Sequence, residues 1–143
     1  VSANAYRAYA LYPANYYFQS YAARCEFLAA QAADNSADFA SSLSSALYFA
    51  RLALAINPYE EEGRMLYAKI LAEDGRLQEA IAYWRDEVLA REFWNPGNHD
   101  FMAQLYLRSS RTEDMKAAVQ ELPLVADVET KSRLRRMKKL FGM

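Results

Sequence analysis

Few residues of this 143-residue chain have side chains suited to chemistry, and they are spread along the sequence. His99 is the only histidine, so a catalytic triad or a histidine metal site would have to be built around it. The three glutamates from Glu60 to Glu62 supply carboxylates, but acidic residues in the first turn of a helix are explained by the helix dipole alone. The four glycines do not form a phosphate-binding loop. We therefore expect no catalytic residue, no metal and no cofactor.

The single histidine and the single cysteine have ordinary structural interpretations. His99 stands beside Asp100 near the start of an expected helix, which favours a surface or packing role. Cys25 lies in the alanine-rich segment "AARCEFLAA", so we interpret it as a small buried hydrophobe. A single cysteine excludes an internal disulfide and a multi-cysteine zinc site, and it leaves the compartment open.

The composition excludes some classes of partner. Seventeen Lys and Arg residues against eighteen Asp and Glu residues give a formal net charge of −1, so no global field attracts nucleic acid. We find no apolar run approaching the roughly 20 residues of a membrane span, and the N-terminus lacks a signal-peptide pattern. We expect a soluble segment, bacterial cytoplasmic or periplasmic, with a hydrophobic content of 53% that is ample for a core. Because it begins at Val1, we expect it to be part of a longer protein.

Prolines and glycines divide the chain into helices. Pro13, Pro58 and Pro96 each follow a short helical phrase, and two of them follow an asparagine. Asn57 and Asn95 are predicted N-caps, because an asparagine oxygen can accept a backbone N–H of the next turn and proline suits the first helical position. The segments between are rich in Ala, Leu, Tyr, Glu, Arg and Gln without period-2 alternation, which predicts an all-α fold.

Two turns are predicted to close antiparallel helical hairpins. Asp74 and Gly75 are typical of a helix end with glycine in the left-handed conformation. Ser110 and Glu113 have the spacing of a capping box, which would start a helix without glycine.

An apolar pattern recurs along the chain at a fixed distance. One stripe at helical spacing, and the residues 34 positions earlier, are all apolar. The first set is Leu77, Ala80, Ile81, Trp84 and Val88, and the second is Leu43, Ala46, Leu47, Ala50 and Leu54. In addition, "LYAKIL" from Leu66 reappears 35 residues later as "FMAQLY", with Ala68 and Ala103 aligned. A period of 34 residues indicates a repeated helical pair that stacks on its neighbours.

On these residues the chain resembles the tetratricopeptide repeat family, most strongly over residues 57–88. The residues that carry the resemblance are Pro58, Leu66, Ala68, Leu71, Gly75, Ala80 and Trp84. Arg64 and Glu87 depart from the family pattern, and the unit runs three or four residues long before Pro96. The resemblance implies a right-handed α-α superhelix of about three antiparallel helical hairpins with a C-terminal capping helix.

The expected domain is a single one over residues 1–143. Residues 1–14 would be a partial repeat, 15–57 a repeat with an insertion, 58–95 the best-matching repeat, 96–123 a degenerate repeat and 124–143 a basic capping helix. The insertion lies around "AADNSADFASS" and would either lengthen the helices or add a longer loop.

The resemblance implies a non-catalytic scaffold that binds a peptide or partner protein in a concave groove lined by the first helix of each hairpin. The residues implied for that groove are Tyr17, Arg24, Glu62, Met65, Lys69, Asp100, Gln104 and Arg108. Lys69 stands without the asparagines of the family's clamp for chaperone tails, which disfavours a terminal carboxylate as ligand.

Both ends of the chain have further candidate surfaces. Six tyrosines lie near the N-terminus: Tyr6, Tyr9, Tyr12, Tyr16, Tyr17 and Tyr21. They predict either a homodimer interface or an exposed face that would pack on a preceding repeat in a longer chain. At the other end, "ETKSRLRRMKKLFGM" carries six basic residues, with Leu134, Met137 and Phe141 on one helical face. A capping helix is the favoured interpretation, and contact with an anionic membrane is the alternative.

Four other interpretations stay open at this stage. The chain also has the style of repeat domains attached to bacterial membrane or envelope proteins that polymerise or ligate surface polysaccharide. A pentatricopeptide repeat would bind RNA, although the slightly acidic composition disfavours it. A non-repeating helical bundle needs only caps and apolar stripes. A helical hydrolase would need a cryptic pair of carboxylates.

Overall fold

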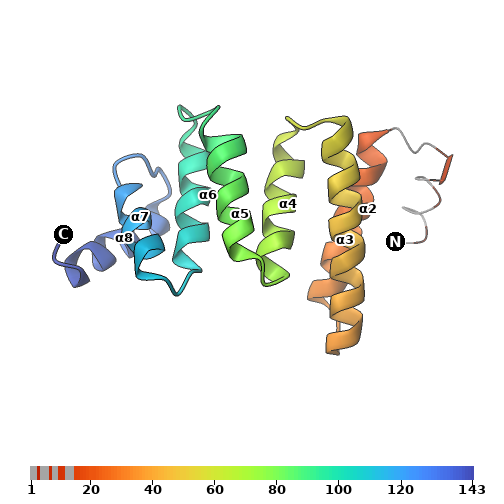
Figure 1. Cartoon of the computed structure of the whole chain (residues 1–143), viewed down its shortest axis with the longest axis horizontal. Helices are drawn as coiled ribbons and strands as arrows, with labels where there is room; N and C mark the ends of the chain where they lie inside the picture. Colours follow the sequence, from red (N-terminus) through yellow and green to blue (C-terminus); the bar gives the residue numbers. More distant parts are fainter. Residues whose placement is uncertain (1–2, 4–6, 8–9, 12–14) are drawn as a thin grey trace. The chain divides into compact units, whose positions relative to one another are not determined.

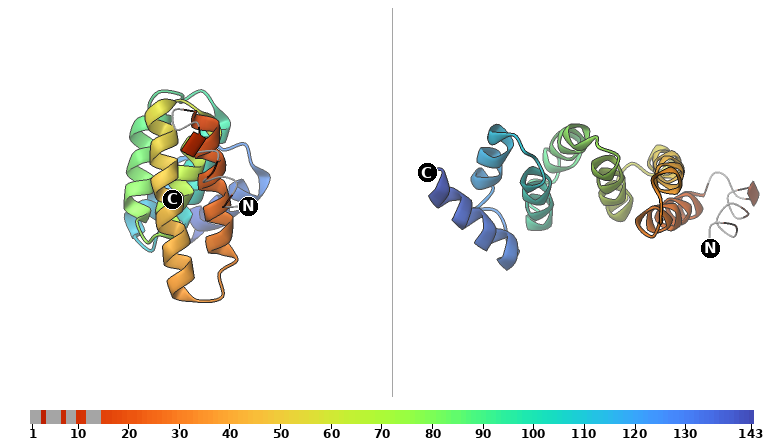
Figure 2. Two further views of the ribbon diagram at one scale, coloured as in Figure 1. Left: turned by 90° about the vertical axis from the view of Figure 1, so that its right-hand side faces the viewer. Right: turned by 90° about the horizontal axis from the view of Figure 1, so that it is seen from below.

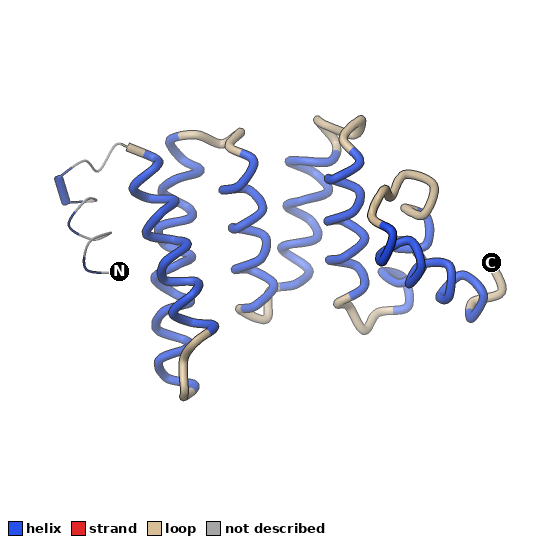
Figure 3. Tube along the Cα trace, turned by 180° about the vertical axis from the view of Figure 1, so that it is seen from behind, coloured by secondary structure: helices blue, strands red, loops and turns tan. Residues whose placement is uncertain are grey.

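The computed structural model describes residues 3, 7, 10, 11 and 15–143, and within these every regular element is a helix (Figures 1 and 3). The elements are α2 (Tyr16–Gln31), α3 (Ser36–Ile56), α4 (Glu61–Glu73), α5 (Leu77–Tyr83), the π-helical η1 (Trp84–Leu89), α6 (Pro96–Leu107), α7 (Thr112–Gln120) and α8 (Val128–Leu140). The chain divides into two compact units, residues 1–76 and 77–143. The predicted partial repeat at residues 1–14 lies largely outside the described residues.

In the first unit the two longest helices pack along each other. Figure 2 shows α2 and α3 side by side, joined by the short connection at residues 32–35. The helices have 16 and 21 residues, against 13 in α4, so the insertion seen in the sequence lengthens the helices and does not form a long loop. Asn35 starts α3, because its side-chain oxygen accepts the N–H of Asp38 at 2.8 Å.

The helix α3 corrects one expectation about hydrophobic runs. By length and composition alone it could cross a membrane, although we expected no run of that kind. One side of it is buried in the first unit, where it packs on α2 and α4. Its buried residues are Leu43, Ala46, Leu47, Phe49, Ala50 and Ala53. A core helix has this composition too, because its buried face must be apolar.

The turn after α4 confirms the prediction made at Gly75. Gly75 has φ of +74°, which side chains rarely adopt, and a Cβ there would meet nothing within 4 Å. Its N–H donates to the carbonyl of Ala72 at 3.3 Å, and the N–H of Arg76 donates to the carbonyl of Leu71 at 2.9 Å. These two bonds satisfy carbonyls at the helix end and define a Schellman motif.

The prediction that Asn57 caps α4 is wrong. Asn57 ends α3 by donating its N–H to the carbonyl of Ala53, and its side-chain oxygen accepts the N–H of Tyr59 at 3.3 Å. Glu60 caps α4 in its place, accepting the N–H groups of Glu62 and Gly63. An Asx turn through Pro58 therefore precedes α4 and delays its start.

The repeated apolar stripe is buried in both units. Eight of its ten residues are buried, and only Leu54 and Leu77 are half-buried. Ala68 and Ala103, which align at a distance of 35, are both completely buried. In the second unit Trp84 is 1% exposed and packs edge-on against Phe101, with ring centroids 4.4 Å apart.

The helix that begins as α5 continues in an unpredicted π-helical turn. In this turn the N–H of Ala90 donates to the carbonyl of Arg85, five residues earlier, at 3.0 Å. A π turn takes up one extra residue within a helix, which accounts for part of the excess length before Pro96. Asn95 then caps α6 as predicted, accepting the N–H of Gly97 at 3.0 Å.

The capping box predicted at Ser110 and Glu113 is wrong. Arg111 precedes the first residue of α7, and its side chain makes no capping hydrogen bond. The hydroxyl of Ser109 instead accepts the N–H of Arg111 at 3.1 Å and donates to the carboxylate of Asp114. Ser109 is buried against α7, whereas Ser110 is exposed. A buried hydroxyl needs a partner, and the start of the helix supplies one.

The helix α8 is capped by Asp127. The side chain of Asp127 accepts the N–H of Thr130 at 2.7 Å. α8 packs on α6 and α7 within the second unit. Leu134 is completely buried there, and Met137 and Phe141 are half-buried. The apolar face of α8 is thus used in packing, while most of its basic side chains are exposed.

Candidate functional site

A pocket of about 190 Å³ lies in the first unit between α2 and the start of α4. These two helices are ones that we expected to line a groove. The lining residues are Tyr16, Tyr17, Ser20, Tyr21, Arg24, Glu60, Glu62, Gly63 and Leu66. The pocket is therefore mainly aromatic on the side of α2 and acidic on the side of α4.

The wall formed by α2 follows from helical spacing. Tyr17, Tyr21 and Arg24 are separated by four and three residues, which places them on one face of the helix. Asn15 fixes where this face begins, because its side chain accepts the N–H of Tyr17 at 3.0 Å. Tyr17 is 67% exposed and Tyr21 is 47% exposed, so both rings are accessible. The rings of Tyr16 and Tyr17 stack with centroids 4.2 Å apart.

The wall formed by α4 depends on a glycine. The carboxylate of Glu60 folds over the first turn of α4, where it accepts the N–H groups of Glu62 and Gly63. A Cβ on residue 63 would lie 2.6 Å from the Glu60 carboxylate and 3.7 Å from Leu54. Gly63 therefore allows this close approach of the cap to the helix.

An ion pair joins the two walls. The guanidinium of Arg24 on α2 lies 2.6 Å from the carboxylate of Glu62 on α4. The two side chains are 58% and 76% exposed, so the pair contributes only about 0–1 kcal/mol to stability. Its main effect is geometric, because it holds both side chains at the pocket.

The hydroxyl groups of Tyr16 and Tyr21 are neutral donors and acceptors at neutral pH. The hydrogen bond with Tyr17 raises the pKa of Tyr16, and the hydrogen bond with Cys25 raises the pKa of Tyr21. The hydroxyl oxygen of Ser20 is buried and has no hydrogen-bond partner within the described residues.

The structure brings together three of the residues implied for the groove. Tyr17, Arg24 and Glu62 line the pocket, while Met65 and Lys69 of α4 are not part of its lining. The other three, Asp100, Gln104 and Arg108, are at α6 in the second unit. Asp100 is engaged in the fold, because its carboxylate accepts the N–H groups of Ala126 and Asp127 at 2.8 and 3.0 Å.

The sequence reasoning missed several residues of the pocket. It placed Tyr16 and Tyr21 in a terminal interface and assigned Leu66 to repeat packing. The spacing of Tyr17, Tyr21 and Arg24 was a usable signal for a shared face. Nothing in the sequence indicated that Glu60 caps α4, because Asn57 before Pro58 is the stronger capping pattern.

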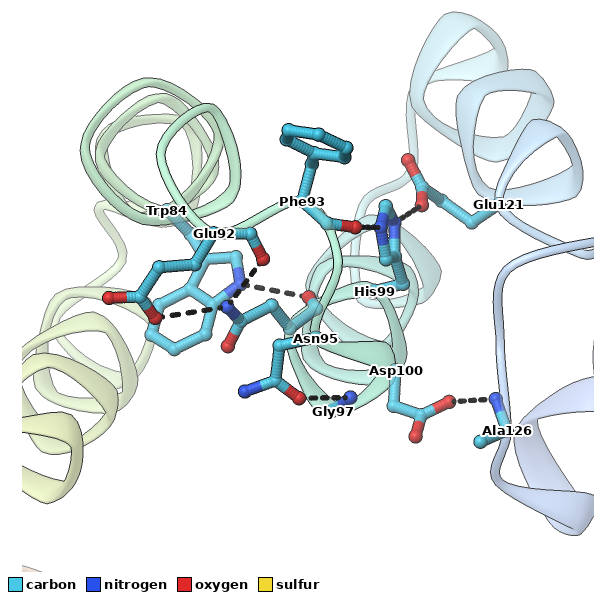
Figure 4. A network of polar contacts seen from close by, with 10 residues as sticks. Trp84, Glu92, Phe93, Asn95, Gly97, His99, Asp100, Glu121 and Ala126 are labelled. Atoms are coloured by element: carbon cyan, nitrogen blue, oxygen red, sulfur yellow. Dashed lines mark hydrogen bonds and ion pairs between the residues drawn. The ribbon is translucent and has the colours of Figure 1, made fainter.

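His99 belongs to a packing network in the second unit (Figure 4). It is buried, with Nδ1 2.6 Å from the carboxylate of Glu121 and Nε2 2.6 Å from the carbonyl of Phe93. Nearby, the indole of Trp84 donates to the carbonyl of Asn98 at 3.0 Å, and the amide of Asn98 donates to the carbonyl of Glu92 at 3.2 Å. These bonds fix the loop before α6.

The other chemical candidates also have structural positions. Cys25 is buried and forms no disulfide within the described residues, in line with the interpretation as a small hydrophobe. Within the part of the chain that the structure describes, no three His, Cys, Asp or Glu side chains are placed to hold a metal ion.

One comparison with known proteins, a search of solved structures, bears on the fold. No protein-family model and no curated protein matches the chain. A thermophilic tetratricopeptide repeat protein of Thermus thermophilus is similar in structure, with a TM-score of 0.76 and 18% sequence identity over 95% of this chain and 70% of that chain. The chain therefore has a tetratricopeptide-like all-α fold, which confirms the fold that the sequence resemblance implied.

Proposed function

We propose that this chain is a non-catalytic protein-interaction scaffold, in which the pocket between α2 and α4 binds a peptide segment of a partner protein. The observation that carries the proposal is the lining of this pocket. Exposed tyrosines from α2 face an acidic wall on α4, with Arg24 reaching across to Glu62. Tyrosine and arginine are enriched at the energetic centres of protein interfaces, because they combine a large contact area with hydrogen bonding.

The size of the pocket favours a side chain over a cofactor. Drug-sized ligands and cofactors usually occupy about 300–1,000 Å³. A pocket of about 190 Å³ is smaller and can accept one or two side chains of an extended peptide. The high exposure of Tyr17 leaves room for the peptide backbone to continue along α2.

The remaining groove residues extend the proposal. On α4, Met65 is half-buried beside the pocket lining, and Lys69 is exposed one turn further along, where a longer peptide would meet it. Gln104 and Arg108 are exposed at α6 and are candidates for a second contact area. Asp100 contributes less to such binding, because its carboxylate already holds the start of α8.

Selection from a random peptide library displayed on phage tests the proposal. The library is enriched on the purified chain, and the affinity of an enriched peptide is measured by fluorescence anisotropy. We expect Tyr17→Ala to weaken binding by about tenfold or more, since a central tyrosine can contribute about 2 kcal/mol. Tyr48→Ala is the matched control, because Tyr48 is 53% exposed and lies on α3 outside the pocket lining. Peptides that bind the Tyr17→Ala variant as tightly as the unaltered chain would place binding elsewhere.

A further inference from the structure

The lining of the pocket carries two carboxylates and one guanidinium. Glu60 and Glu62 lie on the side of α4, and Arg24 lies on the side of α2. Glu61, between the two glutamates, is exposed at the same helix start. We propose that the pocket accepts a cationic side chain, arginine or lysine, from the bound peptide. This inference rests on the proposed function and specifies the chemistry of the partner.

The aromatic wall suits a cation. A guanidinium or ammonium group is attracted to the face of a tyrosine ring when it lies within about 6 Å of the ring centre. Tyr16, Tyr17 and Tyr21 all line the pocket and offer such faces. The aliphatic part of an arginine or lysine side chain can also pack on the rings and on Leu66.

The chain's own Arg24 shows how a cation is held here. Its guanidinium already lies 2.6 Å from the carboxylate of Glu62, beside the tyrosines of α2. Both partners are more than half exposed, so this ion pair is weak and can be opened or shared. A basic side chain of the peptide would bind Glu62 together with Arg24 or in its place.

The same pocket is poorly suited to an anion. The N-terminus of α4 is the natural place for a negative group, because its free N–H groups point outward. The carboxylate of Glu60 already accepts the N–H groups of Glu62 and Gly63 at that position.

An NMR titration of the whole chain tests the inference. Three synthetic peptides share one glycine-serine backbone and carry arginine, glutamine or glutamate at the same positions. We expect the arginine peptide to shift the backbone amide signals of Ser20, Tyr21 and Gly63, with an affinity about fivefold higher than the glutamine peptide. The glutamate peptide should bind most weakly. Added salt should weaken only the arginine peptide, because its charge is screened.

Variants assign the effect to the pocket. Glu62→Gln keeps the size of the side chain and removes its charge, so we expect about a threefold or greater loss of affinity for the arginine peptide and little change for the glutamine peptide. Tyr17→Leu should also weaken the arginine peptide selectively, because it removes the ring and retains an apolar surface. Glu129→Gln is the control, since it removes an exposed carboxylate from α8 in the other unit.

The outcomes separate this inference from the proposed function. If the glutamine or glutamate peptide shifts the pocket signals with equal or higher affinity, the preference for a cation is wrong and peptide binding at the pocket stands. If the arginine peptide shifts signals only away from Ser20, Tyr21 and Gly63, the preference is also wrong. If none of the three peptides shifts these signals, both proposals are contradicted at this site.

Discussion

The imidazole of His99 on α6 lies 2.6 Å from the carboxylate of Glu121, the residue at which α7 ends. The opposite nitrogen of the ring faces the carbonyl of Phe93 at the same distance. One buried side chain therefore connects a helix, the end of the next helix and the loop before α6 (Figure 4). Removing it would leave the carboxylate of Glu121 and the carbonyl of Phe93 without this polar contact.

We predict that His99→Ala lowers the free energy of unfolding by about 2–3 kcal/mol, because buried polar groups lose their hydrogen bonds. Urea denaturation followed by circular dichroism measures the change. Gln104→Ala on the same helix is the control, since Gln104 is exposed. A loss below about 0.5 kcal/mol for His99→Ala, which is typical of surface substitutions, would show that the network contributes little.

The turn at Gly75 predicts a cost that arises from the backbone alone. Because φ is +74° and a Cβ would meet no atom within 4 Å, Gly75→Ala adds strain without a steric clash. We expect a loss of about 1–2 kcal/mol in thermal or urea unfolding. Gly75→Asn should recover part of it, because asparagine tolerates this conformation better than alanine. Equal stability of the alanine and asparagine variants would argue against strain as the cause.

The packing of α8 is tested by two leucines on the same helix. Leu134 is completely buried, whereas Leu140 is 85% exposed. We predict that Leu134→Ala lowers the free energy of unfolding by about 2–4 kcal/mol, since it leaves a cavity, and that Leu140→Ala changes it by less than about 0.5 kcal/mol. Similar values for the two variants would mean that α8 is not a structural part of the second unit.

The cap of α8 predicts a dependence on pH. The backbone N–H of Thr130 donates to the carboxylate of Asp127 and lowers the pKa of that group in the folded chain. A lowered folded pKa stabilises the fold above the unfolded pKa of about 3.9, and this contribution is lost as the pH falls through the folded value. Asp127→Ala should therefore reduce the melting temperature at neutral pH, and the difference from the unaltered chain should shrink in acid. A difference that is constant with pH would show that charge plays no part.

The two surfaces at the ends of the chain also stay predictions. Homodimerisation through the N-terminal tyrosines involves Tyr6, Tyr9 and Tyr12, which lie outside the described residues. Light scattering after size-exclusion chromatography at high concentration measures the mass, and a strict monomer would contradict a dimer. For α8, contact with an anionic membrane is the alternative to its role in packing. Co-sedimentation with liposomes compares the whole chain with a chain that lacks residues 131–143. Equal binding of the two would contradict membrane contact by α8.

The sequence was most informative where one strong local preference acts alone. Gly75 ends a helix and Asn95 starts one as predicted, because no neighbouring residue competes for the same role. The stripe from Leu77 to Val88 was predictable for a different reason. Burial on one face requires apolar residues at helical spacing, and the same spacing recurs 34 residues earlier.

It was less informative where two residues compete. Asn57 and Glu60 both can cap α4, and the choice depends on whether the chain turns at Pro58 and on the space that Gly63 leaves for a carboxylate. Ser109 and Ser110 differ only in which hydroxyl is buried beside Asp114. The pocket was harder to predict than the caps. It depends on how α2 and α4 pack against each other, and no local sequence pattern specifies their distance.

The π-helical turn at residues 84–89 has a consequence for chain length. Such turns arise when one residue is inserted into an α-helix and the surplus is absorbed without moving either end. Trp84 at the start of the turn is buried, and Asn95 after it caps α6, so the packing before the turn and the cap after it are both in place. We expect natural relatives of this chain to vary by a single residue here. In evolutionary terms the segment is a place where length can change while the packing on both sides is retained.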